Sequence, residues 1–181
     1  MGWLFGWQSK AELIRHLTAD EEYTQNEDGA SPRHFRRRTM RSAIRGKCLW
    51  CVNETRCLED GKIDVWIGLA LIERDGQRWG YKDMSEESGP NYYTCPLSFL
   101  DEVPPPPSEF AVSWRMEVRA YHEAAKHQWC VGDRFVFAGH EYELLAPAKR
   151  SWSVRRLSDG RIFRASPRHL IASRMQGLEA A

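Results

Sequence analysis

The chain contains five cysteines, whose thiols could bind a metal ion or attack a substrate. Cys48 and Cys51 have Cys-x-x-Cys spacing, which is half of a common zinc site or, at a helix N-terminus, a redox pair. No second pair of Cys or His follows at ligand spacing. Because the segment is predicted to be a strand, side chains three residues apart point to opposite faces. We therefore expect free thiols, no metal ion and no cofactor.

Two other arrangements could support catalysis. Cys95 could act as a nucleophile if a histidine base lay within hydrogen-bonding reach, but no local pattern points to one of the downstream histidines. Asp83, Glu86 and Glu87 crowd one segment and could serve acid–base chemistry if burial separated their pKa values. A packed thiol and solvated or charge-paired carboxylates are the simpler interpretations. Nucleotide-binding, zinc-protease and serine-hydrolase motifs are also missing, so we predict no catalytic residue.

Arginine gives the strongest positive indication of function. Seven Lys and Arg stand between Arg33 and Lys47 without an acid, and Phe35 lies among them. In a helix, four-residue spacing would align several of these arginines on one face. A second group of cations follows near the C-terminus, and both groups suit contacts with phosphates. The residues predicted to contact nucleic acid are Arg36, Arg37, Arg38, Arg41, Arg45, Arg150, Arg155, Arg156, Arg161 and Arg164, with Lys149, Arg168 and Arg174 extending the C-terminal group.

The distribution of charge leaves other partners open. Residues 48–109 carry five Lys and Arg against twelve Asp and Glu, whereas residues 1–47 carry nine against six. Residues 110–181 carry twelve against seven. An acidic middle between basic ends is informative about partners and not about fold. The basic ends could bind nucleic acid, pair with the acidic middle of the same or another chain, or remain solvated.

Hydrophobic patterning predicts the elements that position these residues. Ser9 and Glu12 have capping-box spacing and start a short N-terminal helix. Three segments rich in Val, Ile, Trp and Leu are separated by Asp-Gly pairs, which favours a three-stranded antiparallel meander. These segments are residues 48–57, 63–72 and 78–81.

Residues 83–96 are predicted to form a loop with aromatic content, and the prolines from Pro104 to Pro107 indicate a polyproline II strut and a boundary. Helical spacing continues through residues 114–125. Short strands in the basic tail predict a small SH3-like barrel or an added antiparallel sheet. We thus expect an α+β protein with an antiparallel meander, two helices and a β-rich C-terminal module. Its expected parts are residues 1–107, 108–130 and 131–181.

Composition is that of a globular protein. Of its 181 residues, 42% are hydrophobic and 28% charged, so a buried core is expected. The apolar start is too short for a signal sequence, and no segment approaches the ~20 apolar residues of a membrane span. Free thiols without an export signal favour a reducing cytoplasm. We expect a cytoplasmic protein without a membrane partner.

Several motifs lie in the first two thirds of the chain. They are MGWLF at residues 1–5, the helix start at residues 9–14, Arg45-Gly46-x-x-Leu49-Trp50, WGYKDMSEESGPNYYTCPL at residues 79–97, and WRMEVRAYH at residues 114–122. Together they resemble an uncharacterised family of small bacterial proteins carried largely by phages, plasmids and integrated elements. The resemblance covers most of residues 1–125, is most specific in residues 79–97 and does not include Cys48 and Cys51. It implies an accessory gene of mobile DNA, for which nucleic-acid handling and interference with host defence are common tasks.

Three functions follow as hypotheses. The leading one is a non-enzymatic accessory protein that binds nucleic acid through its basic surfaces. The second is an inhibitor or anti-defence factor that binds a host protein, and the third is an enzyme that uses Cys95. The second would act through an acidic, aromatic interaction loop made of Trp79, Tyr81, Asp83, Glu86, Glu87, Tyr92 and Tyr93.

Overall fold

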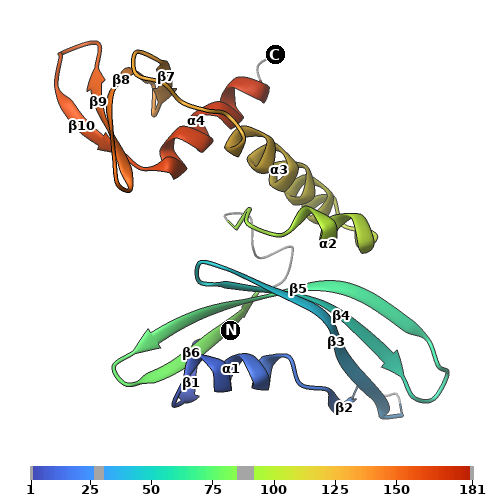
Figure 1. The fold of residues 1–181 in the computed structure, drawn as a ribbon. Coiled ribbons are helices and arrows are strands. Elements are labelled where there is room, and N and C mark those ends of the chain that lie inside the picture. The colour runs from blue at the N-terminus through green and yellow to red at the C-terminus, as the bar shows by residue number, and fades with distance from the viewer. Residues whose placement is uncertain (1, 27–30, 85–91, 180–181) are drawn as a thin grey trace. The chain divides into compact units, whose positions relative to one another are not determined.

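The computed structural model describes residues 2–26, 31–84 and 92–179. The predicted α+β class is confirmed, since four helices and ten strands in antiparallel sheets are found within these residues. The chain divides into two compact units, residues 1–118 and 119–181, each with its own sheet (Figure 1). No helix in the described part of the chain is both long and apolar enough to cross a membrane.

The first unit is built on a six-stranded antiparallel sheet in the order β1-β6-β5-β4-β3-β2, which curls into a half-barrel (Figure 1). Its strands are β1 (Leu4–Trp7), β2 (Glu21–Gln25), β3 (Arg33–Arg45), β4 (Cys48–Cys57), β5 (Ile63–Asp75) and β6 (Arg78–Met84). The predicted meander is confirmed as β4-β5-β6. Both of its Asp-Gly turns use a left-handed glycine, Gly61 at φ 69° and Gly76 at φ 56°.

Helix α1 (Lys10–Leu17) begins where the capping-box spacing predicts. Ser9 Oγ accepts a hydrogen bond from the backbone N–H of Glu12 at 3.1 Å, and the Glu12 carboxylate accepts one from the N–H of Gln8 at 2.9 Å. Figure 1 shows α1 beneath the arch of the sheet. There the buried Leu13 packs in a cluster with Leu49 and other apolar residues, so α1 closes one face of the half-barrel.

The other face of the same strands forms a second core. Along β4, Trp50 and Val52 belong to this core, while the alternating Leu49 and Cys51 face α1. The second core is covered by α2 (Leu97–Glu102) and by the first part of α3 (Glu109–Ala125). Burial on both faces explains why β4 begins with a continuous apolar run instead of an alternating one.

The four prolines lie between α2 and α3 and have no regular secondary structure. Beyond them, Trp114 and Val118 of α3 are still buried in the core of the first unit. The division between the two units falls after Val118, within α3. The first unit therefore includes the part of α3 that carries Trp114 and Val118.

The arginine-rich segment is a strand and not a helix. β3 pairs with β2 on one side and with β4 on the other. Its register with β4 shifts between Thr39 and Arg41, which leaves Met40 as the extra residue of a β-bulge. Arg37 lies before the bulge on the α1 face, whereas Arg41 lies across from Val52 on the other face. The alignment of Arg37 with Arg41 that a helix would produce is therefore not found.

The second unit contains the β-rich module as an antiparallel sheet in the order β10-β9-β8-β7. Its strands are β7 (Arg134–Phe137), β8 (His140–Ala148), β9 (Ser151–Arg156) and β10 (Ile162–Ala165). Helix α4 (Pro167–Glu179) was not predicted from the sequence, and its Leu170 packs with Phe135, Leu144 and Val154 against the sheet. This helix supplies the cover that a four-stranded sheet needs on one face.

Candidate functional site

Two arginines of β3 are paired with carboxylates on other elements. Arg36 Nη2 lies 3.1 Å from Asp20 Oδ2, and Arg41 Nη1 lies 2.6 Å from Glu102 Oε2. The Arg41 guanidinium also lies 5.4 Å from the centroid of the Phe99 ring, within the range of a cation–π contact. Arg41 therefore ties β3 to α2 and is not presented as a free charge.

Arg37 lies under the arch of the sheet, on the α1 face. Its Nη2 is 3.0 Å from Glu21 Oε2, while its Nε is buried without a hydrogen-bond partner among the described groups. Burial raises the pKa of Asp83 on β6, and the charge of Arg37 opposes that shift. Burial also raises the pKa of Cys51 on β4 to about 11, again opposed by Arg37. One guanidinium thus acts on groups from three other strands.

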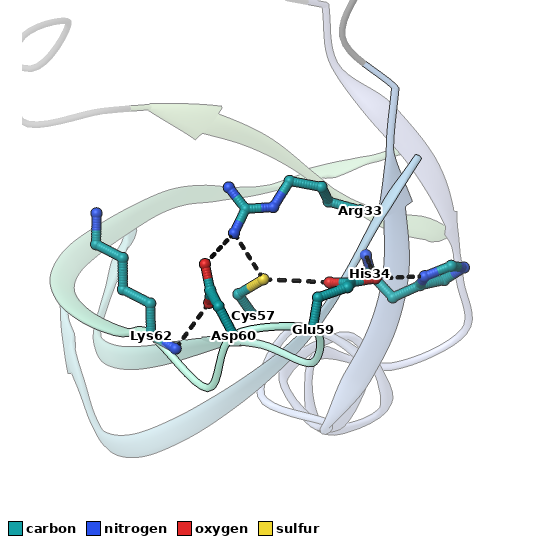
Figure 2. A network of polar contacts seen from close by, with 6 residues as sticks. All are labelled: Arg33, His34, Cys57, Glu59, Asp60 and Lys62. Atoms are coloured by element: carbon teal, nitrogen blue, oxygen red, sulfur yellow. Dashed lines mark hydrogen bonds and ion pairs between the residues drawn. The ribbon is translucent and has the colours of Figure 1, made fainter. Parts of the chain in front are cut away.

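A network of polar contacts ties the start of β3 to the β4–β5 turn (Figure 2). Arg33 Nη2 donates a hydrogen bond to Cys57 Sγ at 3.0 Å and another to the Asp60 carboxylate. Glu59 Oε1 accepts a hydrogen bond from the backbone N–H of His34 at 2.9 Å and lies 2.7 Å from His34 Nδ1. The thiol of Cys57 donates to Glu59 Oε2 at 3.2 Å. The hydrogen bonds from His34 are the main reason that the pKa of Glu59 falls to about 2.

The polar groups of this network are already partnered with one another: Asp60 with Arg33, and Glu59 with His34 and Cys57. The Arg33 guanidinium occupies the position beside a thiol and a carboxylate that a bound cation would need (Figure 2). Asp60 Oδ1 also accepts the backbone N–H of Lys62 at 2.9 Å, and Cys57 is only 3% exposed. Across residues 2–26, 31–84 and 92–179, no three His, Cys, Asp or Glu are placed to hold one metal ion. We interpret the network as a clasp that holds the hairpin.

The thiols singled out for chemistry lie inside the first unit. Cys48 and Cys51 are buried on opposite faces of β4, as the strand prediction requires. Cys95 is fully buried in the core with Trp50, and its Sγ lies 3.8 Å from the carbonyl oxygen of Pro96. A nucleophile must reach its substrate, and this sulfur is not exposed.

Most of the predicted interaction loop that the structure describes is used for internal packing. Trp79 and Tyr81 pack against the α1 core, and Tyr92 and Tyr93 pack against the opposite one. Of the remaining members, Asp83 lies on the α1 face of β6, where its carboxyl group is partly desolvated although the residue as a whole is accessible to solvent. Glu86 and Glu87 lie outside the described residues. These four aromatic side chains therefore anchor residues 79–84 and 92–96, the described parts of the loop, to the two cores.

In the second unit, the arginines near the β9–β10 turn are paired. Arg156 donates two hydrogen bonds to the Asp159 carboxylate, and Arg161 Nε lies 3.5 Å from the same group. The hydrogen bonds from Arg156 lower the pKa of Asp159 to about 2. Arg155 Nη2 lies 2.5 Å from Glu143 Oε2 on the neighbouring strand. These three arginines, which the sequence predicts to contact nucleic acid, are therefore already paired with carboxylates of their own unit.

The opposite end of this sheet carries free cations. The β8–β9 turn lies there, and the strand register puts the end of β10 close to it, because Ala165 pairs with Trp152 near the start of β9. Helix α4 begins two residues after β10, at the same end of the sheet (Figure 1). The exposed cations from these three elements form what we call the basic end, and within the described residues none of them makes an ion pair. Its members are Lys149, Arg150, Arg164 and Arg168.

The predicted nucleic-acid contacts thus separate into three groups. Arg150 and Arg164 are brought together at the basic end, and six others are held in ion pairs, namely Arg36, Arg37, Arg41, Arg155, Arg156 and Arg161. Arg161 shares the carboxylate of Asp159. In the described part of the chain, Arg38 and Arg45 make no ion pair, although Arg45 Nη1 donates to the Ile44 carbonyl at 3.0 Å. Among these ion pairs, sequence spacing could reveal the short-range pairs of Arg156 and Arg161 with Asp159.

Comparisons of the chain with protein-family models, curated proteins and solved structures gave no match. The candidate site is therefore interpreted from its own geometry and charge.

Proposed function

We propose that the protein binds nucleic acid through the basic end of its second unit. The observation that carries the proposal is the grouping of four exposed, unpaired cations from a turn, a strand end and a helix start, within the part of the chain that is described. Lys and Arg that have no carboxylate partner can release counterions from a phosphate backbone. Arg155, Arg156 and Arg161 of this unit would first have to break their ion pairs with carboxylates before they could bind a phosphate.

The first unit contributes less to this proposed surface. Arg33, Arg36, Arg37 and Arg41 are all engaged with acids of the same unit, so their charge is largely balanced. Within the described residues, Arg38 and Arg45 are the predicted contacts of this unit that are left without an ion pair. The resemblance of residues 1–125 to proteins of mobile DNA supports an accessory function in which nucleic acid is handled. We therefore propose a non-enzymatic, nucleic-acid-binding accessory protein.

The salt dependence of binding tests the proposal. Fluorescence anisotropy with a labelled duplex of about 20 base pairs should show binding at about 50 mM salt. Four phosphate contacts predict a slope of log K against log salt of about −3.6, so raising salt about fourfold should weaken binding roughly a hundredfold. Failure to bind at the lower salt concentration would refute the proposal.

Two variants that remove the same number of positive charges test whether the basic end is the nucleic-acid-binding surface. The first is K149Q/R150Q/R164Q/R168Q, which removes the basic end. The second is R134Q/R155Q/R156Q/R161Q, which removes the same number of positive charges from arginines that face carboxylates. We expect the first variant to lose most of the affinity and most of the salt slope, and the second to retain both. Equal losses would show that only net charge matters and would remove the basic end as the site.

A further inference from the structure

The aromatic rings of the second sheet all lie on one face. Strand register aligns Phe135 with Tyr142, and Phe163 with Val154. Phe137 lies two residues after Phe135, and Trp152 lies two residues before Val154, so both side chains point to this same face. Most of these rings pack in the core under α4. On this sheet, the strand positions of the outer face are therefore left to other residue types, namely Arg134, Val136, Glu141, Glu143, Ala146, Ala148, Ser151, Ser153, Arg155, Ile162 and Arg164.

The most exposed Phe, Tyr or Trp ring among the four strands is already covered in part. Phe163 is 39% exposed, but the Arg156 guanidinium lies 5.0 Å from its ring centroid. Tyr142 contacts the same ring edge-on, with centroids 6.1 Å apart. Arg156 is held in turn by Asp159. An anchored guanidinium thus already lies over the Phe163 ring, at a position where a base would stack.

The burial of the aromatic rings affects which kind of nucleic acid the second unit could bind. Proteins that hold single strands stack successive bases on exposed aromatic side chains. An outer face of charged, hydroxyl and aliphatic side chains offers no such platform. The basic end offers long, flexible cations from separate elements, which suit phosphates whatever the bases between them.

We infer that the basic end binds the phosphate backbone of double-stranded nucleic acid without sequence preference. This inference rests on the proposed function and adds the class of ligand. A duplex has the higher density of phosphate charge, so each contact releases about 0.9 counterion, against about 0.7 for a single strand. With four contacts, the duplex should be bound severalfold more tightly at low salt.

The test uses the full chain and four labelled probes, which are two duplexes of unrelated sequence and one strand of each. We expect both duplexes to bind with equal affinity within about twofold, and each single strand severalfold more weakly, following the charge-density argument. Single strands bound as tightly as duplexes, or a difference of more than about tenfold between the duplexes, would overturn the inference while leaving nucleic-acid binding intact. Failure of all four probes would instead overturn the proposed function itself.

A ring substitution gives a second readout. Phe163→Leu keeps an apolar side chain but removes the most exposed ring of the sheet. We expect its affinity for duplex and single strand to match that of the parent protein. A selective loss of single-strand binding would mean that bases do stack there, and would overturn the inference. The R150Q/R164Q variant provides the contrasting case and should weaken the binding of all four probes.

Discussion

The indole rings of Trp50 on β4 and Trp114 on α3 stack with their centroids 5.7 Å apart and their planes 30° apart. Each ring also donates a hydrogen bond to a residue shortly before α2. Trp50 Nε1 donates to Thr94 Oγ1, and Trp114 Nε1 donates to the carbonyl oxygen of Tyr92, both at 3.3 Å. The two rings thus join the sheet, a helix and the most distinctive sequence motif of the chain.

Replacing Trp114 by alanine should therefore destabilise the first unit strongly. Trp114 is 3% exposed, and loss of a buried tryptophan typically costs about 3–5 kcal/mol. Phe110 on the same helix is 78% exposed, so Phe110→Ala is a matched control with an expected change within about 0.5 kcal/mol. Urea unfolding of both variants measures the difference. Similar losses for the two would contradict the packing described for α3.

Gly80 should not accept a side chain. A Cβ atom there would lie 2.2 Å from Cδ1 of Phe5 and 2.4 Å from the carbonyl oxygen of Leu4, so β1 could not stay paired without moving. We expect Gly80→Ala to cost about 1–3 kcal/mol in thermal or urea unfolding. Gly6, on β1 itself, has open space around its Cβ position, and Gly6→Ala is the control. An unchanged stability of Gly80→Ala would refute the close approach.

Glu59 should contribute to acid sensitivity. Its pKa is lowered from an ordinary 4.5 to about 2 in the folded protein. A lowered pKa means that its contribution to stability is complete above about pH 4.5 and is lost as the pH falls towards about 2. The difference in melting temperature between the parent protein and Glu59→Gln should therefore shrink over that range. The same series with Glu22→Gln is the control, and a difference that does not change with pH would contradict the clasp.

Arg37 should control the titration of Asp83. Since the guanidinium opposes the effect of burial, Arg37→Gln should raise the pKa of Asp83 further. Carbon-detected NMR of the carboxyl group measures this shift directly. Arg36 lies on the other face of β3 and pairs with Asp20, so Arg36→Gln should leave the Asp83 titration unchanged. Equal effects of both variants would mean that Arg37 is not oriented under the arch.

Local signals in the sequence were enough to predict part of this fold. The Ser9 cap and the Asp-Gly turns depend on neighbouring residues alone, and each is confirmed. β3 could not be recognised in the same way, because arginine has no strong strand preference and the segment is held extended by β2 and β4. The bulge at Met40 likewise depends on the register with β4.

The candidate site was predicted less completely than the fold, for a similar reason. The sequence shows how many arginines there are, but whether each is free depends on acids that are distant along the chain. Arg41 meets Glu102 from sixty-one positions away, and Arg155 meets Glu143 of the neighbouring strand from twelve positions away. Within the described residues, Arg150 and Arg164 have no such carboxylate beside them in the folded protein, and spacing along the sequence does not show this.

The location of the thiols gives an experimental handle. Four of the five cysteines are buried in the first unit, and Cys130, which precedes β7, is exposed. A maleimide dye added to the native protein should therefore attach at one position without any substitution. A fluorophore at Cys130 and another at the end of a nucleic-acid probe would make energy transfer a direct measure of where along the probe the second unit binds.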